Sequence, residues 1–405
     1  MIKRISISNF KNLLNVPALE CDRINALIGP NGSGKSSFLQ AIDFLRAFFL
    51  TSVEVYLRDH DWDFRDLPNL REARKTISWD IEAELPPGAN GRGAGFYHYK
   101  VALSPRRYLG VSEECLEYKA SFSSPYELLL NREGRSVQWL NRRTGNNEKF
   151  KEIGLPASVI SRLEPHLAHD KHPELLRFRE WVENFRAFLL WDPKVLRTPD
   201  RGKHDTLGPS GEHLAPLLAK LKREKPEAFT KLVNRVKRLF PTVSDISVKG
   251  GRAWGWQTLH LHEANGHAVV FNSQQMSDGV LRLLALTSLL YLERIPSVIT
   301  FEEPENGVHP QLIREVVQVL KELTLRKAPN QCQVFFTTHS PYVLDEFFDH
   351  PEQVFLVERG RPLEGATIRR LSQRPQLKIV RDAFEQSLGE AWVNGMIGAT
   401  AGAKL

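Results

Sequence analysis

The spacing of apolar residues divides the chain into segments of different secondary structure. Near the amino end, apolar runs at 4–10 and 24–29 predict two strands, and a helical pattern of apolar residues covers about 36–50. From about 76 to 150 apolar residues recur at every second position between turn residues, which predicts an antiparallel sheet. From about 151 to 240 apolar residues recur at helical spacing, including one long amphipathic segment at 173–190.

The remainder of the chain alternates between helices and buried strands. A long loop is expected at about 192–211, and strands are expected between 245 and 272. Beyond these, the pattern predicts helices at 279–292, 310–326 and 341–348 and strands at 297–302, 332–338 and 353–357. Strands that alternate with helices form parallel sheets with crossover helices. We therefore expect an α/β unit built from both ends of the chain, with a β region and a helical region inserted between them.

Composition favours a folded, water-soluble protein of two or three domains. The chain has 405 residues, of which 41% are hydrophobic and 25% charged. The first residues do not have the pattern of a signal peptide, and no apolar run reaches the ~20 residues that a membrane span needs. Three widely separated cysteines have no metal-ligand spacing and suit a reducing compartment. We expect a cytoplasmic protein without membrane contact.

The net charge of +7 favours acidic partners such as nucleic acid, although modestly for a chain of this length. Basic residues cluster at 104–108, 141–151, 197–204 and 220–240. A solvated helix face explains any one of these clusters equally well. DNA is therefore a candidate partner that composition alone does not establish.

The motif with the strongest chemical meaning is "GPNGSGKS", Gly29 to Ser36, which fits G-x-x-x-x-G-K-[ST] between a predicted strand and a predicted helix. Its glycines let successive backbone N–H groups point at phosphate oxygens, and the following helix adds its positive end. Lys35 is expected to reach the β and γ phosphates, and the Ser36 hydroxyl is expected to ligate Mg²⁺. The predicted nucleotide-binding residues are Lys11, Gly29, Pro30, Asn31, Gly32, Ser33, Gly34, Lys35, Ser36 and Ser37.

Two carboxylates stand at the tip of a strand that is expected to be buried, in "SVITFEEPE". Phosphate loops that use Mg²⁺ need a carboxylate on a neighbouring strand, and hydrolysis needs a group that orients the attacking water. We assign Glu302 to the metal together with Ser36, and Glu303 to the water. A solvated strand end would explain one Glu, but it explains two less well.

His339 ends the next predicted strand, in "QVFFTTHSP". From that position a histidine can hydrogen-bond the γ-phosphate and the attacking water, so the predicted catalytic residues are Glu303, His339 and Lys35. A lone histidine is more often structural, and the assignment rests on its place one strand–helix–strand unit after Glu303.

"MSDGVLR", residues 276–282, opens a predicted helix with Ser277, Asp278 and Gly279. Such a helix start binds anions. Because one site needs only one phosphate cradle, a second one suggests contact in trans with the γ-phosphate of a nucleotide on another subunit. A simple capped helix explains the motif as well.

These motifs in this order, preceded by "ISNFKNL", resemble the RecF/SMC-like branch of the ABC ATPases, and most closely the stand-alone ATPases related to the OLD family. The resemblance covers about 1–50 and 270–350. It implies a Walker A motif at 29–36, a signature at 277–279, a Walker B pair at 302–303 and a D-loop after Pro304. It also implies that Lys11 contacts the nucleotide and that His339 is the switch histidine.

Two features depart from the family pattern. Glu302 stands where Asp is usual, and a Q-loop glutamine is not identifiable, since Gln138 is the only glutamine of the β region. The residues after His339 are too few and too poor in carboxylates for the Toprim nuclease of OLD proteins, so no intrinsic nuclease is expected. The helices of the insertion lack sustained heptads and are broken by prolines, which argues against an SMC coiled coil.

The predicted fold class is α/β, an ABC-type P-loop ATPase head with a mixed sheet, an antiparallel β subdomain and a helical insertion. The predicted divisions are 1–75 (ATPase lobe I), 76–150 (β subdomain), 151–240 (helical insertion), 241–357 (ATPase lobe II) and 358–405 (extension).

The resemblance implies an ATPase that dimerises head to tail around ATP and Mg²⁺ and controls a nuclease or toxin effector in bacterial antiphage defence. Two alternatives remain open. One is a RecF-like DNA-binding repair ATPase, and the other is a nucleotide-binding scaffold with slow turnover.

Overall fold

The computed structural model of the protein describes most of the chain. The described residues are 1–49, 53–70, 76–88, 91, 93–104, 110–151, 157–189, 192–202, 204–250, 255–265, 267–327, 330–360, 365–375, 377–378, 382 and 387–398. Apart from Ser104, the basic run predicted at 104–108 lies outside these residues, as does Lys203 of the run at 197–204.

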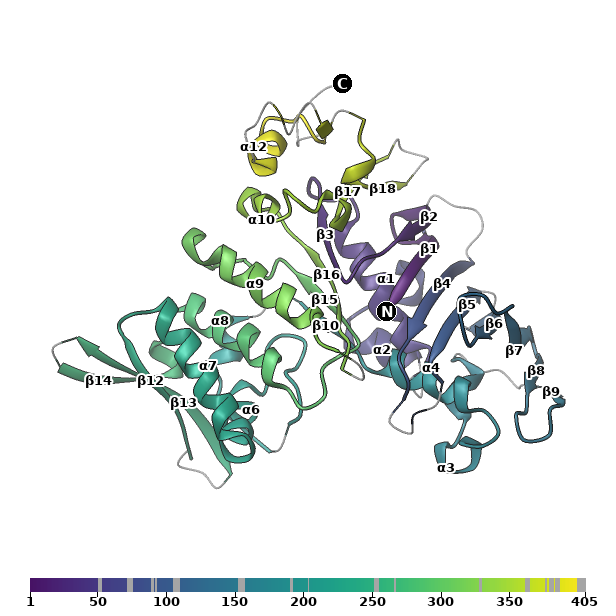
Figure 1. The fold of residues 1–405 in the computed structure, drawn as a ribbon, viewed down its shortest axis with the longest axis horizontal. Helices are drawn as coiled ribbons and strands as arrows, with labels where there is room; N and C mark the ends of the chain where they lie inside the picture. The colour runs from purple at the N-terminus through teal and green to yellow at the C-terminus, as the bar shows by residue number, and fades with distance from the viewer. Residues whose placement is uncertain are drawn as a thin grey trace.

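A six-stranded sheet in the order β10-β15-β16-β3-β17-β18 forms the centre of the molecule (Figure 1). Its strands are β10 Phe185–Phe188, β15 Val298–Glu302, β16 Gln333–Thr337, β3 Ile24–Ile28, β17 Val354–Arg359 and β18 Ala366–Arg370. Pairing is parallel from β10 to β17, and β18 adds antiparallel. Strands β3, β15, β16 and β17 are buried over most of their length, as parallel strands covered on both faces should be. Both ends of the chain therefore meet in one sheet, as predicted.

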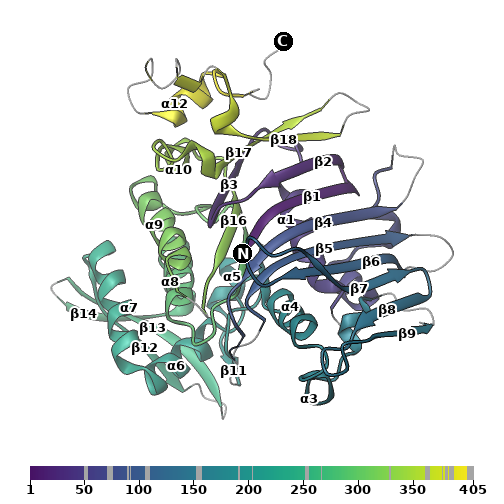
Figure 2. The same ribbon diagram turned by 45° about the vertical axis from the view of Figure 1, so that its right-hand side comes forward.

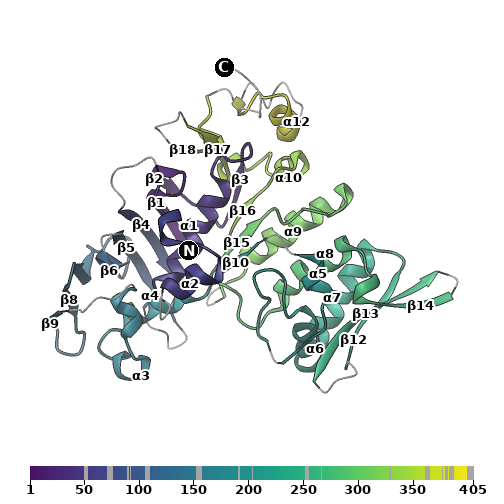
Figure 3. The ribbon, with the colours of Figure 1, turned by 180° about the vertical axis from the view of Figure 1, so that it is seen from behind.

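Helices cover both faces of this sheet. Helix α1 (Lys35–Ala47) packs against β10, β15 and β16, whereas α9 (Ile313–Thr324) packs against β16 and β3 and also contacts α8 (Asp278–Ser288). Figures 1 and 3 show α1 on one side of the sheet and α8 and α9 on the other. The residue pattern explains the two layers, since Phe38 and Ile42 of α1 belong to one apolar core and Leu284 of α8 to the other.

An eight-stranded antiparallel sheet lies beside α1 in the order β2-β1-β4-β5-β6-β7-β8-β9 (Figure 2). Its strands are β1 Ile2–Phe10, β2 Leu13–Glu20, β4 Ile77–Leu85, β5 Gly95–Ser104, β6 Gly110–Lys119, β7 Glu127–Glu133, β8 Ser136–Leu140 and β9 Asn147–Lys151. Burial alternates strictly along β4, which confirms the predicted period of two. The sequence pattern missed β2, because a register shift opposite Ile5 and Ile7 and the presence of Pro17 interrupt its alternation.

The region between the two halves contains helices and a third sheet. The helices are α2 Val53–Asp59, α3 Pro165–Ala168, α4 Pro173–Glu183, α5 Pro193–Arg197, α6 Leu214–Glu224 and α7 Pro226–Leu239. The third sheet contains β11 Asp200–Arg201, β12 Val243–Gly250, β13 Trp256–Asn265 and β14 His267–Asn272. In the part of the chain that the structure describes, the remaining helices are α10 Pro341–Asp345 and α12 Leu388–Val393, with 3-10 turns at Phe64–Asp66, Val159–Arg162, Ser273–Gln275, Leu289–Tyr291, Pro310–Leu312, Pro351–Gln353 and Leu371–Gln373.

The prediction of one long helix at 173–190 was wrong in its second part. Helix α4 ends at Glu183, and Phe185–Phe188 form β10, which pairs with the buried strand β15. Asn184 fixes the change of direction, because its Nδ2 donates to the Ile295 carbonyl at 3.0 Å. Tertiary pairing has thus overridden a helical sequence pattern. None of the described helices is long and apolar enough to cross a membrane.

Candidate functional site

The register of the central sheet brings the predicted motifs to one edge. Thr337 at the end of β16 pairs with Glu302 of β15 on one side and with Leu27 of β3 on the other. The loops that follow these strands therefore leave the sheet side by side, at the carboxyl ends of parallel strands. The glycine-rich loop, the two glutamates and His339 are brought together by this register.

Two glycines let the loop after β3 pass close to the neighbouring chain. Gly29 has a φ of 149°, and a Cβ placed there would lie 2.0 Å from the Val357 carbonyl oxygen. Gly34 has a φ of 119°, and its Cβ would lie 3.0 Å from the Asn12 amide nitrogen. A side chain at either position would displace the backbone or the Asn12 side chain.

Helix α1 begins directly after Gly34 with uncapped backbone N–H groups. Gly34 supplies no side-chain cap, and the first turn has no acidic residue. Such a helix start attracts anions. Lys35 is buried, and its Nζ donates to the carbonyls of Gly29 at 2.9 Å and Pro30 at 3.1 Å. Asn31, Gly32 and Ser36 are exposed, so the loop is open to a ligand.

The electrostatic surroundings of Lys35 are finely balanced. Burial lowers the pKa of its ammonium group to about 8, although the charges of Glu303 and Glu302 oppose that shift. An anion bound in the loop would add negative charge next to Lys35 and raise its pKa toward the usual value.

Glu302 has the surroundings of a cation ligand. It lies close enough to the Ser36 hydroxyl for that group to influence its pKa, while its Oε1 is buried without a hydrogen-bond partner. Burial, followed by the charge of Glu303, raises the pKa of this carboxyl group, and the Ser36 hydroxyl opposes the rise. An orphaned carboxylate oxygen next to a hydroxyl fits a Mg²⁺ ion, which takes oxygen ligands.

Glu303 leaves the strand in an unusual conformation. Its φ is 45°, and its N–H donates to the carbonyl and the hydroxyl oxygen of Thr337, each at 3.2 Å. This turn ends the strand and places Glu303 Oε1 3.7 Å from His339 Nε2. Positive φ is uncommon outside glycine and marks a position that the surrounding structure enforces. Burial, then Lys35, lowers the pKa of His339, so its imidazole is neutral near pH 7.

Lys11 lies in the turn between β1 and β2, at the rim of the site. Its Nζ donates to Gln40 Oε1 of α1 at 2.7 Å and lies 3.4 Å from the ring centroid of Trp62. Burial lowers its pKa to about 8, against the charges of Asp66 and Glu302. Sequence reasoning missed Gln40 and Trp62, because a glutamine on a helix and a tryptophan after α2 carry no motif.

Glu305 is a third carboxylate of this edge; it lies in the stretch predicted as a D-loop and had no individual role in that prediction. It is 8% exposed, and Thr338 Oγ1 donates to its Oε1 at 2.5 Å, while Oε2 is buried without a partner. Burial, and secondarily Glu303, raise its pKa. Its place two residues after Glu303 was the available signal. Gln138, the glutamine of the predicted β region, lies on β8 in the other large sheet.

The predicted signature begins α8, which lies on the opposite side of the central sheet from α1, the helix that follows the glycine-rich loop. Ser277 caps α8 by accepting from the Val280 N–H at 3.4 Å, and both Ser277 and Asp278 are exposed. Arg197 donates to the Met276 carbonyl at 2.8 Å and also bonds the Asp278 carboxylate. The structure therefore unites the Walker A, Walker B and histidine residues but leaves the signature on a separate face.

One contact links the signature helix to the loop after the glutamates. Arg282 of α8 donates through Nη1 to the carbonyl of Asn306, and its Nε is buried without a partner. Through this contact, a movement of either segment would displace the other.

The fold and the site define an ABC-type P-loop ATPase of SMC-head architecture. Over 91% of this chain and 97% of the other, the structure aligns with an SMC head bound to the C-winged helix domain of ScpA, at a TM-score of 0.52 and 12% identity. The chain belongs to the family described as "AAA domain, putative AbiEii toxin, Type IV TA system", whose match covers residues 24–345. The predicted fold class is confirmed, and family membership implies ATP hydrolysis.

Two curated relatives match over shorter segments. The DNA replication and repair protein RecF of Shewanella frigidimarina is 46% identical over 44 residues, which are 11% of this chain and 12% of RecF. The energy-coupling factor transporter ATP-binding protein EcfA1 of Methanospirillum hungatei is 24% identical over 102 residues, which are 25% of this chain and 34% of EcfA1. The chain thus spans about an eighth and a third of the length of these relatives.

Proposed function

We propose that this protein hydrolyses ATP at the carboxyl edge of its central sheet. The observation that carries the proposal is the convergence of Lys35, the Glu302–Ser36 pair and the Glu303–His339 pair on one open loop. Lys35 would exchange its two carbonyl partners for phosphate oxygens. Glu303 would accept a proton from the attacking water, and the neutral His339 would hydrogen-bond the γ-phosphate.

Ser36 and Glu302 would hold a magnesium ion. Mg²⁺ supplies charge neutralisation at the β and γ phosphates. Glutamate at position 302 is one methylene longer than the usual aspartate, but it keeps the carboxylate and the contact to Ser36.

We further propose that two chains dimerise head to tail around two ATP molecules. Ser277 is exposed at the start of α8, which lies on the opposite side of the central sheet from α1, so this helix start is available to the nucleotide of a second copy. The pairing of Asp278 with Arg197 offsets the negative charge of this aspartate, which would oppose a phosphate there.

A mass measurement tests this arrangement. Glu303→Gln should bind ATP without hydrolysing it, and its mass in Mg²⁺-ATP should double by light scattering after size exclusion. Glu303→Gln combined with Ser277→Arg should stay monomeric while still binding ATP. Ser123→Arg, at an exposed hairpin position, is the matched control for the new arginine. Dimers that survive Ser277→Arg would rule out the signature contact.

The proposed role of the dimer is to control a separate nuclease or toxin effector in bacterial antiphage defence. The chain belongs to a family described as a putative AbiEii toxin of a Type IV TA system, and this description supports a role in a toxin-based system. Copurification of the chain with the products of neighbouring genes, with and without ATP, tests this. An effector that binds only the ATP state is expected, and a chain that copurifies with none of these products contradicts the proposal.

The similarity to RecF favours DNA binding as a second candidate function. ATP-dependent binding to duplex DNA that weakens steeply with salt is then expected, because phosphate contacts release counterions. No binding at low salt would exclude it.

A further inference from the structure

Three potential metal ligands outside the nucleotide site converge near the start of α6. Asp200 lies in β11, His204 in the loop after it, and His213 directly before α6. One ligand atom from each lies within 4.8 Å of the other two. Two imidazoles and a carboxylate are a donor set that divalent transition metals, zinc above all, prefer.

The two imidazole rings lie face to face beside the carboxylate. The rings of His204 and His213 stack with centroids 3.5 Å apart and an interplanar angle of 3°. Neutral imidazole is the form that binds metal. His213 Nδ1 is hydrogen-bonded to Asp200 Oδ2, and His204 Nε2 lies 4.0 Å from the same oxygen.

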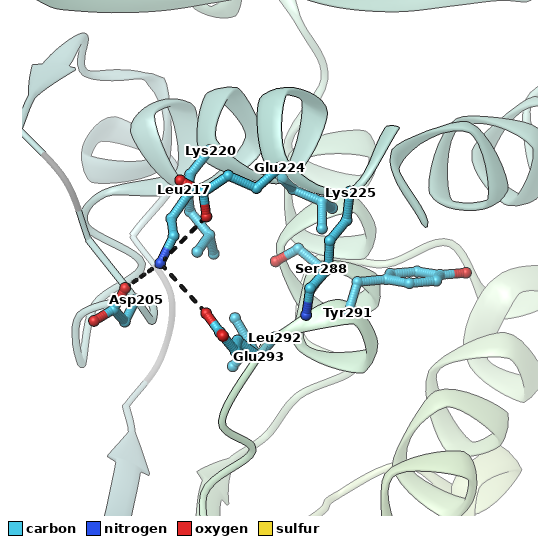
Figure 4. A pocket seen from close by; sticks show the side chains of 10 residues that line it. Asp205, Leu217, Lys220, Glu224, Lys225, Ser288, Tyr291, Leu292 and Glu293 are labelled. Carbon is cyan, nitrogen blue, oxygen red and sulfur yellow. Dashed lines mark hydrogen bonds and ion pairs between the residues drawn. The ribbon is translucent and has the colours of Figure 1, made fainter. Parts of the chain in front are cut away.

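The backbone holds all three residues in place. His213 has a φ of 73°, a left-handed conformation that is uncommon for a residue with a side chain, and it offers α6 no side-chain cap. Asp200 is fixed by its strand pairing with Gln257. Asp205, which follows His204, bonds Lys220 of α6, and Lys220 also lies 3.8 Å from Glu293 (Figure 4).

We propose that Asp200, His204 and His213 bind one zinc-like divalent ion, with water completing its coordination. Zinc at 2.0–2.2 Å from each donor sets tetrahedral ligand atoms about 3.3 Å apart. The hydrogen-bonded His213 and Asp200 must therefore move slightly apart, whereas His204 Nε2, 4.0 Å from the Asp200 oxygen, must come closer. Parallel rings do not aim their lone pairs at one point, and His204 therefore has to turn. Its Nε2 interaction with the Arg201 carbonyl, at 3.1 Å, is the contact exchanged for the metal.

The site is reachable from solvent, and its position gives it a structural consequence. The side chains of His204, His213 and Asp200 are 29%, 33% and 29% exposed. Helix α5 lies just before β11, and its last residue, Arg197, holds Met276 and Asp278 at the start of the signature helix. An ion that fixes Asp200 would restrict the movement of α5, and with it the contacts of Arg197 to the start of the signature helix, without contacting the nucleotide.

Cobalt binding tests the proposal directly. The full chain, expressed without a polyhistidine tag and stripped with EDTA, is titrated with Co²⁺, whose visible absorption reports tetrahedral nitrogen and oxygen ligation. One Co²⁺ per chain is expected, displaced by one Zn²⁺, with a rise in Tm of several degrees on zinc binding. His204→Gln/His213→Asn should weaken binding at least tenfold, and asparagine tolerates the left-handed backbone.

His166→Gln/His169→Gln, at exposed positions on and after α3, is the matched control and should bind like the wild type. His204→Gln alone gives the same test if the double variant does not fold, since position 204 has ordinary backbone geometry. Binding that is absent in the wild type, or equal in the site and control variants, overturns the proposal and leaves an Asp–His hydrogen bond with a stacked ring.

Discussion

Nε2 of His339 lies 3.7 Å from Oε1 of Glu303, although 35 positions of sequence and a whole helix separate the two residues. The parallel pairing of β15 with β16 and the left-handed turn at Glu303 create this proximity. Lys35 is the third member of the group. Its charge adds to the effect of burial in lowering the pKa of His339. The charge of Glu303 in turn opposes the lowering of the Lys35 pKa by burial. The three side chains therefore form one electrostatic unit.

Replacing Lys35 should abolish tight ATP binding without harming the fold. Lys35→Met removes a charged donor to phosphate, a contact worth about 1.5–3 kcal/mol, so ATP affinity should fall about 10- to 150-fold. Isothermal titration measures the affinity. Lys149→Met on β9 is the control and should bind normally. The free energy of unfolding should not fall, because the buried charge of Lys35 destabilises the folded protein. An ATP affinity unchanged from the wild type would contradict the assignment.

ATP affinity should decrease above pH 8. Lys35 and Lys11 each have a pKa lowered to about 8 in the nucleotide-free protein, and bound phosphate would raise both values. The contribution of each lysine is therefore fully present below pH 8 and is lost as the pH rises, by up to about tenfold per unit for each. Titrations from pH 6.5 to 9.5 at fixed free Mg²⁺ measure this. Lys35→Met should have a shallower slope, and a flat wild-type profile would refute the prediction.

Glu305→Gln should stabilise the protein at neutral pH. Burial raises the folded-state pKa of Glu305, so its ionisation costs stability as pH rises above the unfolded value of about 4.5. The amide keeps an acceptor for Thr338 and removes that cost. Denaturant unfolding should show a stability gain at pH 7.5 that shrinks toward pH 4.5. A gain that is independent of pH would point to another cause.

Arg282→Gln should uncouple the signature helix from the loop after Glu303. The arginine contact to the Asn306 carbonyl is lost, while every residue of the glycine-rich loop is untouched. ATP affinity of the monomer should stay within about twofold, and turnover should fall at least tenfold. Arg326→Gln is the control, because Arg326 also donates to a carbonyl, that of Leu290, away from the site. Equal turnover in wild type and Arg282→Gln would remove the coupling role.

The sequence predicted the parts of the site that have a local signature. Gly29 to Ser36 is recognisable because backbone curvature and phosphate chemistry demand fixed residue types at fixed spacing. Glu302, Glu303 and His339 were found because each ends an apolar run, and parallel strands bring such ends together.

The rest depended on tertiary structure. The stretch 185–188 reads as helix, but its pairing with β15 makes it a strand. Gln40 and Trp62 join the site through the turn that holds Lys11, and no spacing rule links these positions. The sequence pattern did not single out Glu305, because the two adjacent carboxylates before it already accounted for the motif. Its contact with Thr338 comes from the neighbouring strand. The pattern along the chain does not predict contacts that a residue makes with distant segments.

The central claim, that Glu303 activates water for ATP hydrolysis, is tested most directly by phosphate release in a single turnover. Wild type, Glu303→Gln and the exposed control Glu227→Gln are compared at saturating Mg²⁺-ATP, with nucleotide binding verified for each. We expect Glu227→Gln to match the wild type and Glu303→Gln to be slower by at least about 100-fold, the usual size of a general-base contribution. Release by Glu303→Gln within twofold of the wild type would contradict the account.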